Sequence, residues 1–220
     1  MIEPQIKIHL GDCMEAMSAM EDNAFDLAIV DPPYGIDVGK QRIGSERKTA
    51  KWNNPNKYEY KVFEDGEIPS KEYFEQLFRI SKNQIVWGGN YFTEYLPPSK
   101  GWIVWNKKAD IKEHLSMAEL AWTSFDKKCN VFEYLWAGFK KKKQIKRIHP
   151  TQKPIDLYKW ILKHYAEKGS KIIDTHGGSM SIALACHEMG FDLDLWEIYE
   201  EYYNAGLKRF NDHKAQLRIW

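Results

Sequence analysis

The first part of the chain shows two apolar patterns that predict strands. Residues 5–10 alternate polar and apolar side chains, which is typical of a strand. Residues 25–30 form an apolar run that predicts a buried strand. Between them, Asp12 and Glu15 suit the start of a helix. A strand, a short helix and a second strand indicate a parallel pair.

The middle of the chain opens with a long polar stretch. Residues 35–69 contain few apolar positions and many Gly, Lys, Asn and Pro residues, which indicates a long loop of a kind that is usually functional or disordered. A helix is expected next, with Ser70 as its N-cap. Its apolar face consists of Tyr73, Phe74, Leu77 and Phe78. Three short strands are predicted at residues 84–87, 101–105 and 118–125. A less regular insert is predicted at residues 129–148.

The last part of the chain alternates between helical and strand patterns. Pro154 suits the first position of a helix that runs towards Gly169. Strands are expected at residues 171–174 and 191–197, with a helix at residues 182–189 between them. A final helix presents Tyr203, Leu207 and Phe210 on one face. This alternation predicts an α/β fold in which helices cover both faces of a mostly parallel sheet.

Composition limits the class of protein. The chain has 220 residues, 43% of them hydrophobic and 29% charged, as expected for one globular domain spanning residues 1–220. It shows neither an apolar run long enough to cross a membrane nor an export signal. Cys13, Cys129 and Cys186 are odd in number and lack C-x-x-C spacing, which argues against disulfides and against a structural zinc site. We therefore expect a cytoplasmic protein that has no membrane partner.

The formal net charge is only +1, but the basic residues are concentrated in two stretches. The first, within residues 40–61, includes Lys48 and Lys51. The second, residues 140–153, contains no acidic residue and holds Lys140, Lys141, Lys142, Lys143, Lys146, Arg147 and Lys153. Two basic stretches in a nearly neutral chain indicate contact with nucleic acid. A solvated surface loop is the simpler explanation for a single lysine run.

The most unusual motif follows the predicted strand at residues 25–30. Asp31, Pro32, Pro33 and Tyr34 form a stiff turn, because proline fixes φ and lacks an N–H. Ligands bind at such strand ends in open α/β sheets. The Asp31 carboxylate, the Pro32 carbonyl and the Tyr34 ring suit a planar substrate that carries an exocyclic NH2 group. The alternative is a proline-rich turn in which Asp31 merely caps the next element.

A second group of candidate residues follows the predicted strand at residues 171–174. Asp174, Gly177, Gly178 and Ser179 belong to a glycine-rich turn, which lets a ligand approach the backbone closely. Glu197 ends the next strand, where an acid can accept hydrogen bonds from both hydroxyl groups of a ribose. Together these features favour a nucleoside-containing cofactor, although strand–helix packing alone also explains a glycine turn.

The order of these motifs resembles that of one enzyme family. The Asp-Pro-Pro-Tyr turn, the His-Pro-Thr-Gln-Lys-Pro segment at residues 149–154, the glycine turn and Glu197 resemble the β-class S-adenosylmethionine-dependent DNA amino-methyltransferases. The resemblance extends from residue 5 to about residue 212. It implies a Rossmann-like methyltransferase fold with circularly permuted motif order and a seven-stranded sheet, in which one strand is antiparallel. It also implies methyl transfer to the exocyclic amine of a flipped-out base.

The resemblance also implies roles for individual residues. Asp31, Pro32 and Tyr34 are expected to hold the target base, and Pro33 to shape the turn. The cofactor pocket is expected to include Asp12, Thr151, Gln152, Lys153, Asp174, His176, Gly177, Gly178, Ser179 and Glu197. Asp12 is expected near the adenine of the cofactor, and residues 151–153 over its methionine end. The chemistry requires no metal.

Three residues depart from the Asp-Pro-Phe-x-Gly-Ser-Gly turn that is usual in the family, namely Thr175, His176 and Met180. Met180 is expected to weaken cofactor binding if its position requires φ > 0 or a close approach to the cofactor. One alternative is therefore a DNA-binding protein that has kept the fold and lost catalysis. Asp31 favours adenine N6 as the target, and cytosine N4 is the other alternative, because N4 enzymes more often carry Ser at that position.

The expected partner is double-stranded DNA. Residues 35–69 and the insert at about residues 128–148 are the predicted DNA-contacting elements, and their basic residues are expected to bind phosphates without reading sequence. The insert is short, so sequence specificity is expected to be modest, or to depend partly on residues 35–69 or on a second subunit in a homodimer. A restriction endonuclease is a further candidate partner.

Overall fold

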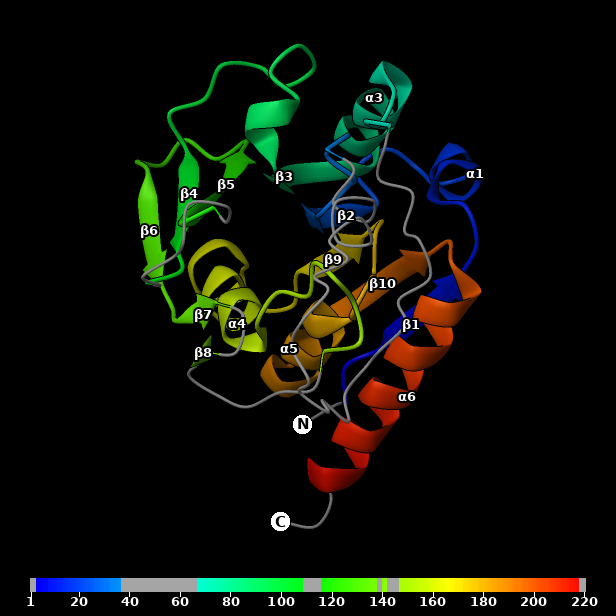
Figure 1. Cartoon of the computed structure of the whole chain (residues 1–220). Helices are drawn as coiled ribbons and strands as arrows, with labels where there is room; N and C mark the ends of the chain where they lie inside the picture. Colours follow the sequence, from blue (N-terminus) through cyan, green and yellow to red (C-terminus); the bar gives the residue numbers. More distant parts are fainter. Residues whose placement is uncertain (1–2, 37–66, 109–115, 138–139, 142–146, 218–220) are drawn as a thin grey trace, which may run out of the picture.

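The computed structural model describes residues 3–36, 67–108, 116–137, 140–141 and 147–217. Its main strands are β1 Ile6–Leu10, β2 Phe25–Val30, β3 Ser81–Trp87, β4 Trp102–Asn106, β5 Ala118–Thr123, β6 Asn130–Glu133, β9 Lys171–Asp174 and β10 Asp192–Glu197. They form one eight-stranded sheet in the order β1-β10-β9-β2-β3-β5-β4-β6 (Figure 1). A second, two-stranded sheet pairs β7 Trp136–Ala137 with β8 Lys140–Lys141. The helices are α1 Cys13–Ser18, α3 Lys71–Ile80, α4 Ile155–Tyr165, α5 Ser181–Met189, α6 Glu200–Leu217 and the 3-10 helix η1 Gly89–Tyr91.

The strand directions confirm the predicted fold class. β5 runs antiparallel to both β3 and β4, and every other neighbouring pair in the large sheet is parallel. The sheet has eight strands where seven were expected. The difference is β6, which lies in the insert predicted to be irregular and pairs in parallel with Ile103–Asn106 of β4.

The apolar run of β2 is explained by its central position in the sheet. Leu27 and Ile29 belong to a core that also contains side chains of α4, α5 and α6. Ala28 and Val30 point the other way, into a core shared with α1 and α3. Successive side chains of a strand face opposite sides, so a strand covered on both sides must be apolar throughout. Helices therefore cover both faces of the sheet, as predicted.

Two helices differ in detail from the sequence expectation. Pro154 is the N-cap of α4 and not its first helical residue, because its ψ of 147° is extended. The buried face of α6 is shifted by one residue from the predicted row at its start. It consists of Tyr202, Gly206 and Phe210. Within the described part of the chain, no helix is both long and apolar enough to cross a membrane.

Candidate active site

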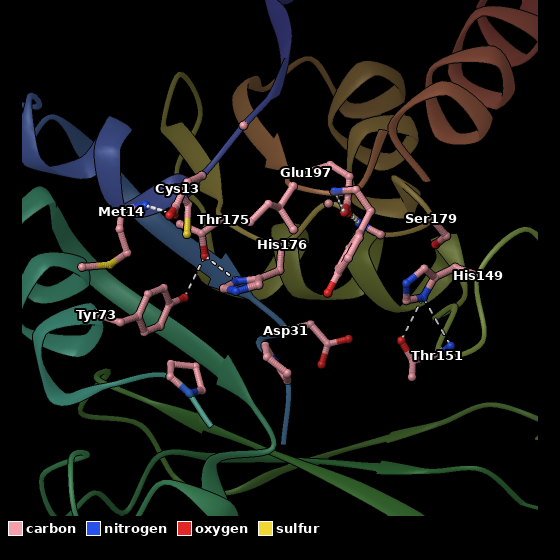
Figure 2. Close-up of a pocket in the computed structure, with 18 of the residues that line it drawn as sticks. Cys13, Met14, Asp31, Tyr73, His149, Thr151, Thr175, His176, Ser179 and Glu197 are labelled. Atoms are coloured by element: carbon pink, nitrogen blue, oxygen red, sulfur yellow. Dashed lines mark hydrogen bonds between the residues drawn. The ribbon is translucent and has the colours of Figure 1, made fainter. Parts of the chain in front are cut away.

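The carboxyl ends of several parallel strands border a pocket of about 320 Å³ (Figure 2). Gly11 follows β1, Asp31 follows β2 and Glu197 ends β10, and all three line this pocket. Strand ends of this kind are the usual ligand sites of open α/β sheets. The sequence-predicted site residues that line it are Asp12, Asp31, Pro33, Thr151, Gln152, Lys153, His176, Gly177, Gly178, Ser179 and Glu197.

Three predicted site residues are not part of the pocket lining. Pro32 is buried within its turn. Asp174 is 2% exposed, and its carboxylate accepts a hydrogen bond from the backbone N–H of His176 at 3.0 Å. Burial raises the pKa of Asp174 to about 8. The Tyr34 ring stacks on Tyr91, with the ring centroids 5.2 Å apart.

The glycine turn and Glu197 fix each other's position. Gly178 has a φ of +49°, a conformation that favours glycine, and its N–H donates to Oε2 of Glu197 at 2.7 Å. The N–H of Tyr199 donates to Oε1 at 2.9 Å. Burial raises the pKa of Glu197, although the backbone N–H groups oppose that shift. Each carboxylate oxygen can accept a second hydrogen bond, so Glu197 can also bind ligand hydroxyl groups.

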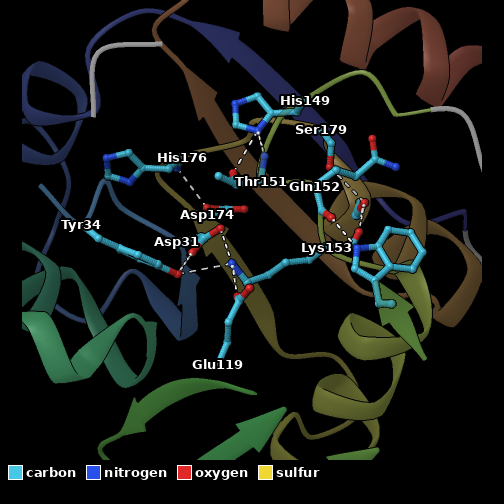
Figure 3. A network of polar contacts seen from close by, with 12 residues as sticks. Asp31, Tyr34, Glu119, His149, Thr151, Gln152, Lys153, Asp174, His176 and Ser179 are labelled. Atoms are coloured by element: carbon cyan, nitrogen blue, oxygen red, sulfur yellow. Dashed lines mark hydrogen bonds and ion pairs between the residues drawn. The ribbon is translucent and has the colours of Figure 1, made fainter. Parts of the chain in front are cut away.

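Both oxygens of the Asp31 carboxylate have a donor (Figure 3). The Tyr34 hydroxyl donates to Oδ1 at 2.5 Å, and the Lys153 ammonium donates to Oδ2 at 2.5 Å. Gly88, after β3, makes room for this arrangement, because a Cβ atom there would clash with the Tyr34 ring. The aromatic ring and the carboxylate are therefore held as one unit.

Lys153 departs most from the expected arrangement. The resemblance implies that residues 151–153 cover the methionine end of the cofactor, and Lys153 does line the pocket. Its ammonium, however, lies between Asp31 and Glu119, 3.3 Å from Oε2 of Glu119. Sequence reasoning missed Glu119, because nothing in the β5 pattern indicates that this strand reaches the Asp-Pro-Pro-Tyr turn.

His149 and Thr151 form the pocket wall next to Lys153. The Nδ1 atom of His149 lies 3.0 Å from the Thr151 hydroxyl and accepts the Thr151 N–H at 3.3 Å. Burial, together with the nearby Lys153, lowers the pKa of His149 to about 3, so the ring is neutral at pH 7. His149 begins the His-Pro-Thr-Gln-Lys-Pro segment but was absent from the predicted site residues.

Other lining residues had no signal in the sequence. Cys13 and Met14 come from the first turn of α1, Tyr73 from α3 and Tyr158 from α4. In the sequence these side chains resemble ordinary core positions, because only the packing of their helices brings them to the pocket. Among the described residues, no group of three or more His, Cys, Asp or Glu side chains could hold a metal ion.

The sequence matches one known protein family. The family described as DNA methylase (N6_N4_Mtase) matches residues 63–208, which include the segment at residues 149–154, the glycine turn and Glu197. The chain belongs to this N6/N4 DNA methylase family. The matched region begins after Asp31, so family membership does not depend on the Asp-Pro-Pro-Tyr turn.

Several known proteins resemble this chain at low sequence identity. Type II methyltransferase M2.MboI from Moraxella bovis is 24% identical over 83% of this chain and 79% of its own length. The crystal structure of M1.HpyAVI in complex with SAM is 18% identical, with a TM-score of 0.58 over 93% of this chain and 100% of that one. PvuII DNA methyltransferase, described as cytosine-N4-specific, is 12% identical, with a TM-score of 0.61 over 96% of this chain and 92% of its own. These likenesses show a shared fold.

Two of the departures from the family turn make polar contacts of their own. The Thr175 hydroxyl lies 2.7 Å from the Tyr73 hydroxyl and 2.9 Å from Nδ1 of His176. Burial lowers the pKa of His176 to about 4, although Asp12 opposes the shift. An uncharged imidazole, fixed through Thr175 to α3, therefore borders the pocket where the family usually has a phenyl ring.

Met180 meets one of the two conditions under which it was expected to weaken cofactor binding. Its φ is +55°, so the position does require the left-handed conformation. Its side chain is 0% exposed and does not line the pocket. It packs instead against Gly206 of α6, where a Cβ atom would lie 2.7 Å from Met180 Cγ. The thioether thus packs away from the pocket, and the left-handed backbone conformation is the condition that carries a cost.

Most of the predicted DNA-contacting residues lie outside the described part of the chain. These are Lys48, Lys51, Lys142, Lys143 and Lys146. The backbone of Lys140 and Lys141 forms β8. Arg147 is described, and its guanidinium lies 5.8 Å from the centre of the Trp136 ring. The Trp136 indole donates to the carbonyl oxygen of Gln152 at 3.0 Å, which joins this basic segment to the pocket wall.

Proposed function

We propose that the protein transfers a methyl group from S-adenosylmethionine to the exocyclic N6 amine of adenine in double-stranded DNA. One observation carries this proposal: Asp31, from the N-terminal part of the chain, lines the same pocket as Gly178 and Glu197, from the C-terminal part. An acceptor suited to an amine and a turn suited to a nucleoside thus share one cavity. Membership of the DNA methylase family supports the reaction class.

The chemistry of the pocket fits S-adenosylmethionine. Glu197 offers acceptors for the ribose hydroxyl groups, and the turn at Gly178 allows a close approach to the backbone. Gln152 is 4% exposed, and its Nε2 donor has no hydrogen-bond partner among the described residues, which suits a carboxylate ligand. Bound there, S-adenosylmethionine supplies an electrophilic methyl group on a sulfonium. A solved protein of the same fold, M1.HpyAVI, is in complex with SAM.

In this proposal, Asp31, Pro32 and Tyr34 act on the target base. The adenine amine is a poor nucleophile, because its lone pair is delocalised into the ring. Hydrogen bonds from the amine to the Asp31 carboxylate and the Pro32 carbonyl stabilise the positive charge that develops on nitrogen. A base inside a duplex is out of reach, so it must be flipped out, and Tyr34 offers an aromatic surface for stacking.

Cytosine N4 is the second candidate target. The carboxylate at position 31 favours adenine, yet PvuII DNA methyltransferase, described as cytosine-N4-specific, has the same fold. Mass spectrometry of nucleosides from the methylated DNA distinguishes the two targets. N6-methyldeoxyadenosine is expected, and N4-methyldeoxycytidine in its place would assign the enzyme to cytosine.

Two variants test the proposed reaction. Asp31→Ala is expected to abolish transfer of labelled methyl groups to DNA while the protein stays folded. Glu197→Ala is expected to weaken S-adenosylhomocysteine binding by ~1.5–3 kcal/mol, as for the loss of hydrogen bonds to a charged group. Glu200→Ala, at an exposed position in the first turn of α6, is the matched control for calorimetry. Full activity of Asp31→Ala would contradict the role of that carboxylate.

The same calorimetry tests the alternative of a DNA-binding protein without catalysis. That alternative rested on Thr175 and Met180, and the Met180 side chain turns out to pack away from the pocket. Saturable binding of S-adenosylmethionine is expected from the wild-type protein. DNA binding without any cofactor binding would favour the inactive alternative.

A further inference from the structure

Four side chains of alternating charge form a row from the end of β4 to the Asp-Pro-Pro-Tyr turn, namely Lys107, Glu119, Lys153 and Asp31. Figure 3 shows the last three. The Lys107 ammonium lies 2.6 Å from Oε1 of Glu119, and Oε2 of Glu119 lies 3.3 Å from the Lys153 ammonium. Lys153 in turn lies 2.5 Å from Oδ2 of Asp31. The side chain of Lys153 is only 3% exposed, so it depends on these two carboxylates for its charge partners.

The sheet keeps this row of charges in place. Glu119 lies on β5, opposite Trp105 of β4, and the N–H of Lys107 donates to the Met117 carbonyl at 3.0 Å. The Lys153 ammonium lies 5.2 Å from the centre of the Trp87 ring at the end of β3. Lys153 therefore has a rigid wall on one side and two carboxylates, Asp31 and Glu119, on the other.

The position of Lys153 conflicts with the task proposed for Asp31. The target amine must donate to the Asp31 carboxylate, whose oxygens already accept from Tyr34 and Lys153, so the amine has to share an oxygen with one of these donors. A cation bound to Asp31 would also oppose the positive charge that develops on the amine during methyl transfer. Methyl transfer is therefore favoured when Lys153 weakens its hold on Asp31 as the base arrives.

We propose that Glu119 is a positioning residue for methyl transfer, because it holds the Lys153 ammonium while the target amine takes the place of Lys153 on Asp31. This inference rests on the proposed function. The two carboxylates lie 2.5 and 3.3 Å from the same nitrogen, so a small movement transfers the ammonium from one to the other. The Lys153 ammonium keeps an ionic partner throughout that movement, and the Asp31 carboxylate exchanges its cation for the hydrogen bonds of the amine.

The charge states of the two residues agree with this role. Burial opposes ionisation of Glu119, yet Lys153 and Lys107 together lower its pKa. Burial opposes the charge on Lys153 as well, yet Asp31 and Glu119 raise its pKa. Both side chains are therefore ionised at neutral pH, and Glu119 is available as an ionic partner for Lys153.

The test uses one variant that should lose activity and a second substitution that should restore part of it. In Glu119→Gln, Lys153 has only Asp31 as an ionic partner, so kcat/KM for DNA is expected to fall roughly 10- to 100-fold, the effect of one charge-assisted hydrogen bond. In Glu119→Gln/Lys153→Met the competing ammonium is gone, and kcat/KM is expected to rise at least about fivefold above the single variant. Binding of S-adenosylhomocysteine and the unfolding midpoint show whether each variant is folded.

Glu133→Gln is the matched control, because Glu133 pairs with Lys108 at 2.6 Å near the same strands and lies outside this row of charges. Its kcat/KM is expected to equal that of the wild-type protein. Wild-type activity in Glu119→Gln would overturn this inference and leave the proposed function standing. A double variant no more active than Glu119→Gln would do the same, because it would indicate a merely structural role for Glu119. A wild-type protein that transfers no methyl group at all would overturn the proposed function, and the inference with it.

Discussion

At the scale of single residues, Tyr34 makes two separable contacts. Its hydroxyl donates to Asp31, and its ring stacks on Tyr91. Tyr34→Phe removes only the hydroxyl, and we expect methyl transfer to slow roughly tenfold because the hydrogen bond that orients the Asp31 carboxylate is lost. Base flipping, followed by the fluorescence of 2-aminopurine at the target position, is expected to persist.

The control for this prediction is Tyr34→Ala, which also removes the ring. Stacking of a base on an aromatic side chain contributes ~1–3 kcal/mol, so the flipped-out base should be bound correspondingly less tightly. If Tyr34→Phe abolished the fluorescence change as completely as Tyr34→Ala does, the ring could not be the surface that receives the base.

Asp174 couples the stability of the fold to pH. Its pKa is about 8 in the folded chain, against about 4 for an exposed aspartate. Between these values the folded state keeps a proton that the unfolded state has released, so the free energy of unfolding contributed by Asp174 falls as pH rises. An asparagine cannot ionise, so Asp174→Asn is expected to remove this loss of unfolding free energy. The loss amounts to at most ~1.4 kcal/mol per pH unit.

Urea unfolding at pH 5 and pH 7.5 checks this prediction in both proteins. The wild-type protein is expected to lose more stability than Asp174→Asn between the two pH values. The amide of the variant can still accept the His176 N–H, so the comparison isolates the charge. Equal losses in the two proteins would mean that Asp174 is already ionised in the folded state.

The place of a single residue in the site was predictable from the sequence where the residue belongs to a local motif. Asp31 and Glu197 were placed at strand ends from pattern alone, and both line the pocket. The contact of Lys153 with Glu119 was not predictable, because it joins a loop to an antiparallel strand that is distant along the chain. Such ion pairs depend on strand order, which no short window of sequence contains.

At the scale of elements, Met180 at the start of α5 packs against Gly206 of α6. Gly206→Ala would bring a Cβ atom to 2.7 Å from Met180 Cγ. Overpacking of this kind costs ~1–3 kcal/mol, against a gain of about 1 kcal/mol in helix propensity. We therefore expect a net loss of about 1 kcal/mol in the free energy of unfolding, measured with urea.

A second background tests the cause of that loss. In Met180→Gly the thioether is absent, so Gly206→Ala should now stabilise the protein through helix propensity alone. The two substitutions would then show a coupling energy of roughly 1–3 kcal/mol, as neighbours in contact do. An identical effect of Gly206→Ala in both backgrounds would show that the two side chains do not compete for space.

Elements were predictable in proportion to the length of their apolar pattern. The run at β2 and the periodic face of α3 gave clear expectations, and both elements are present. β6 has only four residues, of which Val131 and Phe132 are apolar, and such a short pattern cannot be told from a loop. Its pairing with β4 supplies the hydrogen bonds that make it a strand.

At the scale of the whole molecule, the sheet order explains how two distant motifs form one site. β2 and β10 are separated in the sheet only by β9, although they lie near opposite ends of the sequence. Alternation of strands and helices predicted a parallel sheet but not this order. The order was accessible only through the resemblance, which relates the sequence of motifs to a circularly permuted fold.

The basic stretches are predicted to act on DNA binding as a whole. Replacing all four lysines of residues 140–143 with glutamine should weaken DNA binding about equally for every sequence, because phosphate contacts carry no sequence information. The slope of log affinity against log salt concentration should become shallower by roughly 0.9 for each phosphate that these lysines neutralise in the wild-type protein. An unchanged slope would place these lysines away from DNA, and an altered site preference would place them in the recognition element.

The place of β10 in the sheet has a consequence for how the protein is made. β1 pairs with β10, and Glu197 at the end of β10 forms one wall of the pocket. A ribosome synthesises β1 long before β10, so β1 lacks this neighbour until residues 192–197 have been made. A nascent chain that stalls before residue 192 carries the Asp-Pro-Pro-Tyr turn but no wall for a nucleoside. Unpaired strand edges of this kind favour aggregation, and the complete pocket requires a chain that extends through Glu197.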